Sequence, residues 1–218
     1  MRPQQLYVLL PAKRMHIAIT GNIGAGKTTL AQLLANHYGW DVLYEAVEGN
    51  PYLADFYGDM ERWSFNLQIY FLNSRFEQVK TIRESGRSVI QDRTIYEDAY
   101  IFASNLYRSG NMSERDYETY RCLFDNMVST VQAPDLMIYL RADLPKLMGQ
   151  IRKRGRSFEQ SIGEDYLDSL NVLYEEFARK YTAGELLIID VNDLDYANRH
   201  QDLQHVIGRI DERLGVNS

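Results

Sequence analysis

The feature that most constrains this chain is the run Gly-Asn-Ile-Gly-Ala-Gly-Lys-Thr from Gly21 to Thr28. It lies between an apolar stretch, residues 16–20, and a run with helix-forming composition, residues 29–37. Glycines let successive backbone N–H groups turn inward around phosphate oxygens, while Lys27 adds a cation and the Thr28 hydroxyl can bind Mg²⁺. The run therefore predicts a phosphate-binding loop for a nucleoside triphosphate such as ATP. The expected contacts are Gly21, Asn22, Ile23, Gly24, Ala25, Gly26, Lys27, Thr28 and Thr29.

Length and composition narrow the class of protein. The 218 residues suffice for one α/β domain with a well-buried core, and no low-complexity break suggests a second one. The net charge of -6 argues against a broadly basic surface for nucleic acid. A single cysteine, Cys122, excludes an internal disulfide framework and favours a reducing compartment, so we expect a cytoplasmic protein. No apolar run approaches the roughly 20 residues of a membrane span, and we expect no membrane partner.

The beginning of the chain carries no visible chemistry. Residues 1–14 contain a short apolar piece but no signal-peptide cleavage pattern, and Met15 opens the first expected strand directly. We interpret residues 1–14 as a disordered extension, or Met15 as the true start, and residues 15–218 as a single domain.

Apolar stretches typical of buried parallel strands alternate with longer segments of helical periodicity. The expected strands are residues 16–20, 42–44, 88–91, 136–140 and 186–189. The expected helices are residues 27–38, 61–84, 95–108, 114–131, 144–153, 164–181 and 201–214. This alternation predicts an α/β fold, a doubly wound parallel sheet of about five strands with helices on both faces.

In such sheets ligands bind beyond the carboxyl ends of the strands, so the residues that follow each strand are the candidates for function. Glu45 follows the second expected strand, and Asp92 and Arg93 follow the third. A carboxylate such as Glu45 can accept the proton of a sugar hydroxyl as it attacks phosphorus. The alternative is that Glu45 merely pairs with Arg93 or begins a surface loop. Asp92 stands where an acidic residue commonly binds Mg²⁺, directly or through water.

A basic cluster follows the fourth strand, and it ends a helical pattern at Gly155. Its members are Arg152, Lys153, Arg154 and Arg156. Arginine holds phosphate oxygens in a forked geometry, so we interpret residues 152–162 as an arginine-rich lid over the triphosphate. The alternative is a solvated helix end, where cations favour the carboxyl terminus of the helix dipole.

Together these segments resemble the deoxynucleoside kinase family from about Met15 to about Tyr181. The segments that carry the resemblance are the phosphate loop, Tyr-Glu-Ala-Val from Tyr44, Asn-Pro-Tyr-Leu from Asn50, Glu-Arg-Trp-Ser-Phe from Glu61, Gln68 with Arg75, Asp-Arg-Thr-Ile-Tyr-Glu-Asp from Asp92, and Arg-Gly-Arg from Arg154 followed by Glu159. The resemblance implies a P-loop kinase fold. It also implies transfer of the γ-phosphate of ATP, with Mg²⁺, to the 5′-hydroxyl of a deoxynucleoside in nucleotide salvage.

By this resemblance Glu45 looks like the general base at the 5′-hydroxyl, with Arg93 beside the transferred phosphate and Lys27 completing the catalytic group. Asp92, with Thr28, matches the position near the metal. Asp92 stands where many members of the family have Glu, which shortens its reach and suggests an intervening water.

The resemblance also assigns the acceptor site. Tyr57 and Glu159 match the residues that hold the 3′-hydroxyl, and Gln68 matches the amide that reads the base edge. Arg75 and Asp98 match a pair associated with purine or cytosine recognition. Gln68 and Arg75 are about two helical turns apart and share a face, although without the other motifs that face would be more typical of a solvent-exposed surface. A charged pair disfavours the thymine methyl group, so we expect deoxyadenosine and deoxyguanosine as substrates, with deoxycytidine open.

The same resemblance matches Arg154 and Arg156 to lid arginines over the donor. It further implies a homodimer, formed through the helices around residues 95–131, and feedback binding of a deoxynucleoside triphosphate. The nearest rival is a nucleoside monophosphate kinase of the thymidylate kinase type, whose acceptor needs arginines rather than a carboxylate base. A noncatalytic nucleotide-dependent switch is a second rival, but the chain has no guanine-reading Asn-Lys-x-Asp segment.

Overall fold

The computed structural model describes residues 14–45, 49–156, 159 and 162–215. Within them the chain forms a five-stranded, wholly parallel sheet with the strand order β2-β3-β1-β4-β5. The strands are β1 (His16–Gly21), β2 (Asp41–Leu43), β3 (Val89–Asp92), β4 (Leu136–Arg141) and β5 (Glu185–Asp190). The expectation of a disordered extension concerns residues 1–13, which lie outside the described residues, and Arg14.

Strand β1 lies at the centre of the sheet and pairs with a neighbouring strand on each side. It pairs with β3, where His16 faces Val89, and with β4, where Ile17 faces Leu136. Both of its faces are covered by helices, and accordingly β1 and β3 are made of buried residues almost throughout. The chain crosses from one side of β1 to the other between β3 and β4, which places a ligand crevice at the carboxyl ends of these strands.

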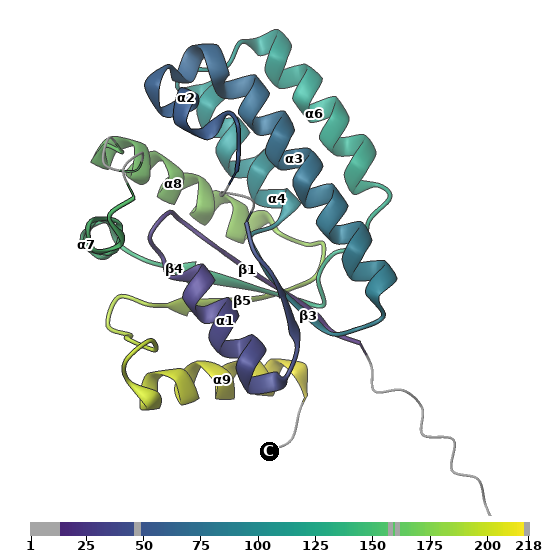
Figure 1. Cartoon of the computed structure of the whole chain (residues 1–218), viewed down its shortest axis with the longest axis vertical. Helices are drawn as coiled ribbons and strands as arrows, with labels where there is room; N and C mark the ends of the chain where they lie inside the picture. The colour runs from purple at the N-terminus through teal and green to yellow at the C-terminus, as the bar shows by residue number, and fades with distance from the viewer. Residues whose placement is uncertain (1–13, 46–48, 157–158, 160–161, 216–218) are drawn as a thin grey trace, which may run out of the picture.

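Helices cover both faces of the sheet: α1 and α9 lie on one face, and α3, α4, α6 and α8 lie on the other (Figure 1). The helices are α1 (Lys27–Tyr38), α2 (Leu53–Gly58), α3 (Met60–Ser85), α4 (Ile95–Glu97), the π-helix η1 (Asp98–Ala103), α5 (Ser104–Arg108), α6 (Glu114–Val128), α7 (Leu144–Arg154), α8 (Glu164–Lys180) and α9 (His200–Leu214). In the described part of the chain, none of these helices is long and apolar enough to cross a membrane.

The sheet and most helices agree with the sequence prediction, but residues 95–108 do not. The prediction of one α-helix there is wrong, because the segment is divided into α4, η1 and α5. A capping box starts α4: the Thr94 hydroxyl accepts the Glu97 N–H, and the Glu97 carboxylate accepts the Thr94 N–H. The wide π-turn then begins at Asp98, among α3, α6 and α8. Apolar periodicity did not reveal it, since α- and π-turns can bury the same side chains. The predicted helix ranges also do not include α2 as a separate helix.

Candidate active site

The phosphate loop follows β1 and leads directly into α1, as predicted. Its glycines are required by geometry: Gly24 and Gly26 have φ angles of 87° and 94°, and a Cβ on Gly24 would lie 2.7 Å from the Leu147 carbonyl oxygen. Lys27 is buried, and its Nζ donates hydrogen bonds to the carbonyls of Gly21 at 2.7 Å and Asn22 at 3.0 Å. The ammonium is therefore held inside the loop, where a phosphate group would need it.

The side chain of Asn22 has a structural role. Its amide nitrogen donates to the Leu167 carbonyl at 2.8 Å and to Asn171 Oδ1 at 2.7 Å, both on α8, and its oxygen accepts the Ile23 N–H at 2.7 Å. These contacts attach the loop to α8. Any contact of Asn22 with phosphate would therefore come from its backbone.

Thr28, the last residue of the phosphate loop, lies next to Asp92. The Thr28 hydroxyl donates to Asp92 Oδ2 at 2.6 Å, and the buried Asp92 Oδ1 has no hydrogen-bond partner among the described residues. An unpartnered buried carboxylate oxygen next to a phosphate loop suits a hydrated Mg²⁺ ion. The described residues contain no cluster of three metal-ligating side chains, so these two residues would hold the ion together with the donor phosphates.

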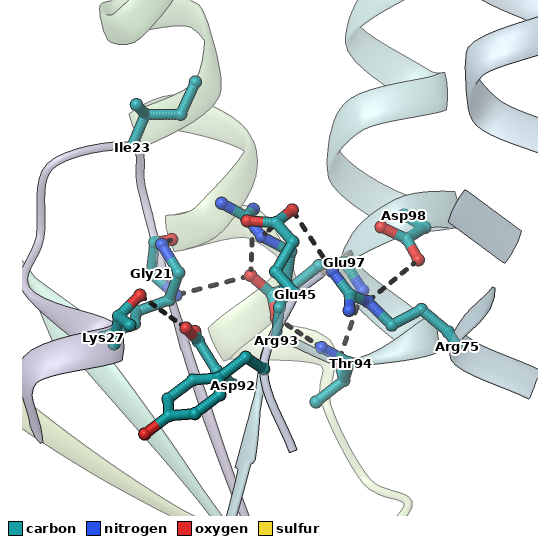
Figure 2. Close-up of polar contacts among 12 residues, drawn as sticks. Gly21, Ile23, Lys27, Glu45, Arg75, Asp92, Arg93, Thr94, Glu97 and Asp98 are labelled. Carbon is teal, nitrogen blue, oxygen red and sulfur yellow. Dashed lines mark hydrogen bonds and ion pairs between the residues drawn. The ribbon is translucent and has the colours of Figure 1, made fainter. Parts of the chain in front are cut away.

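Glu45 follows β2 and lies between two guanidinium groups (Figure 2). Its Oε1 is 2.9 Å from Arg93 Nε and 3.2 Å from Arg75 Nη2. Burial alone would raise the pKa of Glu45, but the positive charges of Arg93, Arg75 and Lys27 outweigh it and lower the pKa to about 2. The carboxyl is therefore ionised at neutral pH, and it remains 21% exposed to the cavity.

Arg93 has an unusual backbone: its φ is 76°, in a region that residues other than glycine rarely adopt. Its N–H donates to the Ile19 carbonyl at 2.9 Å, and its guanidinium lies over the Phe102 ring with 4.6 Å to the ring centroid. Burial would lower the pKa of Arg93, but Glu45 and other acidic neighbours raise it, so the residue stays charged. The structure thus holds Arg93 in a strained conformation directly beside Glu45.

The base-reading residues predicted on α3 are buried rather than on an exposed face. Arg75 is fully buried and its Nε lies 3.6 Å from Asp98 Oδ2. Gln68 is also buried and lines the cavity, and its Oε1 has no hydrogen-bond partner among the described residues. Burial raises the pKa of Asp98 to about 7, against the opposing effect of Arg75 and then Arg93. A buried amide oxygen without a partner is suited to a ligand that brings its own donor.

Glu159 and Tyr57 also line the cavity. Glu159 is bound by two arginines of the predicted lid, with Arg154 Nη2 at 2.6 Å and Arg156 Nη1 at 3.3 Å. In this structure both guanidinia thus contact the carboxylate predicted to hold the sugar. Arg152 is exposed and lies outside the cavity lining. Residues 157, 158, 160 and 161 of the predicted lid lie outside the described residues, and the lid remains a prediction.

One cavity of about 780 Å³ unites most of the predicted residues. The predicted residues in its lining are Ile23, Gly24, Gly26, Lys27, Thr28, Thr29, Glu45, Tyr57, Gln68, Asp92, Arg93, Asp98, Arg154, Arg156 and Glu159. Apolar side chains of Leu67 and Phe71 line it next to Gln68. Arg75 lies outside the lining but forms ion pairs with two lining residues, Glu45 and Asp98.

Gln78 is a residue that sequence reasoning missed. Its Nε2 donates to the Tyr44 carbonyl at 2.6 Å, and its Oε1 accepts from Arg75 Nη1 at 3.4 Å and from Gln91 Nε2 at 3.1 Å. It therefore joins the residue before Glu45 to α3 and β3. The signal was available in principle, because Gln78 is one helical turn beyond Arg75 on the same face.

Three features define the class of protein: a phosphate loop at the centre of a parallel sheet, a hydroxyl–carboxylate pair beside it, and a carboxylate held by two arginines. They are the features of a nucleotide-dependent phosphotransferase of the phosphate-loop kinase class. Comparison with known proteins gives the family. The chain belongs to the deoxynucleoside kinase family, whose model matches residues 17–214.

Curated relatives and solved structures agree with this assignment. The chain is 40% identical over 200 residues to the deoxyadenosine/deoxycytidine kinase of Bacillus subtilis, covering 91% of this chain and 92% of the relative. It is 41% identical over 191 residues to the deoxyadenosine kinase of Dictyostelium discoideum, covering 88% and 77%. A structure of deoxyadenosine kinase from M. mycoides with bound dATP superposes with a TM-score of 0.81 at 34% identity, over 91% of this chain and all of that one.

Proposed function

We propose that the chain transfers the γ-phosphate of ATP to the 5′-hydroxyl of a purine deoxynucleoside, with deoxyadenosine as the preferred acceptor. The observation that carries the proposal is the ionised Glu45 carboxylate, which two guanidinia hold in the same cavity as Lys27 of the phosphate loop. Deoxyadenosine is named for each of the three relatives described above, while deoxyguanosine and deoxycytidine remain candidates for the same pocket.

In the proposed reaction the residues divide between donor and acceptor. Lys27 and the loop N–H groups would neutralise charge on the β- and γ-phosphates, and Arg93 would contact the transferred group. Glu45 would accept the proton of the 5′-hydroxyl while the hydroxyl oxygen forms its bond to the γ-phosphorus and the bond between that phosphorus and the ADP oxygen breaks. Because the neighbouring positive charges lower the pKa of Glu45, this proton would pass on to solvent rather than stay on the carboxylate. Thr28 and Asp92 would hold Mg²⁺, which supplies further charge neutralisation at the phosphates.

The charges on the acceptor side favour a nucleoside over a nucleoside monophosphate. Each cation there is already compensated by a carboxylate: Arg93 and Arg75 by Glu45, and Arg75 also by Asp98. Glu159 in the lining is itself paired with Arg154 and Arg156. An acceptor phosphate would meet these negative charges, whereas a sugar with free hydroxyls can donate hydrogen bonds to them.

The activity is tested with radiolabelled ATP against the four natural deoxynucleosides and their monophosphates, with and without Mg²⁺. We expect a labelled 5′-monophosphate from deoxyadenosine, little or none from thymidine, and no reaction in the absence of a divalent cation. Activity confined to monophosphate acceptors would reject the proposal in favour of a monophosphate kinase.

Base preference follows from the Arg75–Asp98 pair. The double variant Arg75→Met, Asp98→Ala removes the guanidinium and the carboxyl behind the base, so that a thymine methyl group no longer has to desolvate these polar groups. We expect the ratio of kcat/KM for thymidine to that for deoxyadenosine to rise by about 10- to 100-fold. The variant Arg83→Met, which changes an exposed arginine near the end of the same helix, serves as the control and should leave the ratio unchanged. An unaltered ratio in the double variant would remove this pair from base recognition.

We also propose a homodimer formed through the face around residues 95–131. Large apolar side chains are exposed there: Tyr100, Tyr107 and Leu123 are 42%, 37% and 39% exposed. A second copy of the chain covering this face would bury them. Sedimentation equilibrium should therefore give twice the 25.4 kDa mass of the chain, and a monomer at micromolar concentration would contradict the proposal.

A further inference from the structure

Two buried residues that the proposed mechanism does not use lie between the phosphate loop and Arg93. Tyr174 comes from α8, and its hydroxyl is 2.8 Å from the Gly21 carbonyl oxygen and 2.8 Å from Glu97 Oε1. The same Glu97 oxygen accepts the Gly21 N–H at 3.5 Å. Both residues have no exposed surface. The first glycine of the phosphate loop is thus held through its N–H and through its carbonyl by this pair.

The same two side chains also hold Arg93. Its Nη1 lies 3.4 Å from the Tyr174 hydroxyl and 3.6 Å from Glu97 Oε1. The second carboxylate oxygen of Glu97 accepts the N–H of Thr94, the residue after Arg93, at 2.9 Å, and Figure 2 shows Glu97 between Gly21 and Thr94. These contacts fix the direction of a buried guanidinium whose backbone is strained at φ 76°.

From this geometry we infer that Glu97 and Tyr174 are positioning residues that fix the phosphate loop on the donor side relative to Arg93 on the acceptor side. The inference rests on the proposed kinase function. Neither residue is in the cavity lining, so neither would touch a substrate. The pair would affect the reaction through two residues. One is Gly21, whose carbonyl also accepts a hydrogen bond from Lys27 Nζ at 2.7 Å, and the other is Arg93. A shift of the pair therefore displaces Lys27 and Arg93 relative to each other, and such misplacement lowers the rate of transfer.

The hydroxyl of Tyr174 can be removed without removing its packing. The ring stacks on Tyr139 of β4, with 5.6 Å between centroids and 9° between planes, and Tyr174→Phe keeps this stack. Tyr139 offers a matched control, because its hydroxyl bonds to Glu175 at 3.0 Å and to nothing in the loop. Tyr139→Phe thus deletes a hydroxyl from the neighbouring ring and leaves Gly21 and Arg93 as they are.

The test compares steady-state kinetics of the two variants, with deoxyadenosine and ATP varied in turn. We expect Tyr174→Phe to lower kcat about tenfold with both KM values within about twofold of the wild-type values, because positioning is lost but binding groups remain. Tyr139→Phe should stay within about twofold of the wild type in every constant. A normal kcat for Tyr174→Phe, or an equal loss in Tyr139→Phe, would overturn the inference.

A double-mutant cycle separates a coupled pair from two independent structural effects. Glu97→Gln keeps an acceptor for the Thr94 N–H and should also lower kcat about tenfold, and combining it with Tyr174→Phe should lower kcat little further. Losses that multiply to about 100-fold would mean that the residues act separately. Should the Glu97→Gln chain fail to fold, the comparison of Tyr174→Phe with Tyr139→Phe decides alone. A wild-type chain inactive on every deoxynucleoside would reject the proposed function, whereas active variants with normal kcat reject only this inference.

Discussion

Glu45→Gln is expected to lower kcat for deoxyadenosine about 1000-fold, with a change in KM of less than about fivefold. The substitution keeps the shape of the side chain and removes the charge that we propose takes up the 5′-hydroxyl proton, and general-base groups contribute about 100- to 10,000-fold to rate. Binding depends less on this charge, because Tyr57, Gln68 and Glu159 remain in the cavity. The loss should therefore appear in turnover rather than in binding.

The variant should still fold, which keeps this result interpretable. Removing the Glu45 charge leaves Arg75 with Asp98, at 3.6 Å, and Arg93 with Glu97, also at 3.6 Å. Neither buried guanidinium is left without an acidic neighbour, a condition that would be strongly destabilising. Glu77→Gln on α3 is the matched control, because Glu77 is exposed and pairs only with Lys80 among the described residues. A Glu45→Gln enzyme with more than about one tenth of the wild-type kcat would remove Glu45 from the mechanism.

The pH dependence gives a second check on Glu45. Its pKa is lowered to about 2 in the folded chain, so the carboxylate is already ionised well below the range in which kinases are assayed. Its ion pairs add stability above the ordinary pKa of 4.5, and this contribution disappears as the pH falls from 4.5 to about 2. Between about pH 5 and about pH 7, the kcat of the wild type should therefore either stay constant or change in the same way as the kcat of Glu45→Gln.

Much of the fold was predictable because local signals coincide with the element ends. Helix α1 has the predicted bounds, since Gly26 precedes it and Gly39, with a φ of 68°, ends it. The strands were predicted to within one residue at either end, because each is a short apolar run between polar segments. Residues 95–108 could not be divided correctly, since η1 owes its form to packing among α3, α6 and α8 rather than to a local pattern.

The candidate site shows the same division. The phosphate loop and the residues after β2 and β3 follow from strand order, and the structure brings them into one cavity. Tyr174 could not be predicted in this way, because it contacts Gly21 across 153 residues of sequence from the middle of an otherwise ordinary helix. Its apolar neighbours on α8, Leu170 and Phe177, give it the pattern of a core position. Only the three-dimensional arrangement shows that its hydroxyl contacts Gly21 and Glu97.

Lys27→Met is expected to lower kcat/KM for ATP about 100- to 1000-fold, because one preplaced donor to the transferring phosphate contributes about that much. Methionine fits the space of the buried lysine stem but leaves the carbonyls of Gly21 and Asn22 without their hydrogen bonds from Nζ, so the thermal midpoint of the variant is measured alongside its kinetics. Lys80→Met, at an exposed lysine on α3, is the control and should behave as the wild type. Calorimetric titration with ADP would show whether the loss includes ground-state binding. A variant that keeps more than about one tenth of the wild-type kcat/KM would exclude Lys27 from phosphate contact.

The pKa of Lys27 gives a way to test whether the positive charge of this side chain is required for activity. Burial, and next the charge of Arg93, lower that pKa from 10.5 to about 8, although Asp92, Glu97 and Glu45 act in the opposite direction. The free enzyme therefore carries the ammonium below about pH 8 and loses it above, so kcat/KM for ATP in the wild type should fall as the pH rises through about 8. Lys27→Met has no such group and should lack this fall. If both proteins lose activity equally above pH 8, another group is titrating, and the ammonium of Lys27 is not what the triphosphate requires.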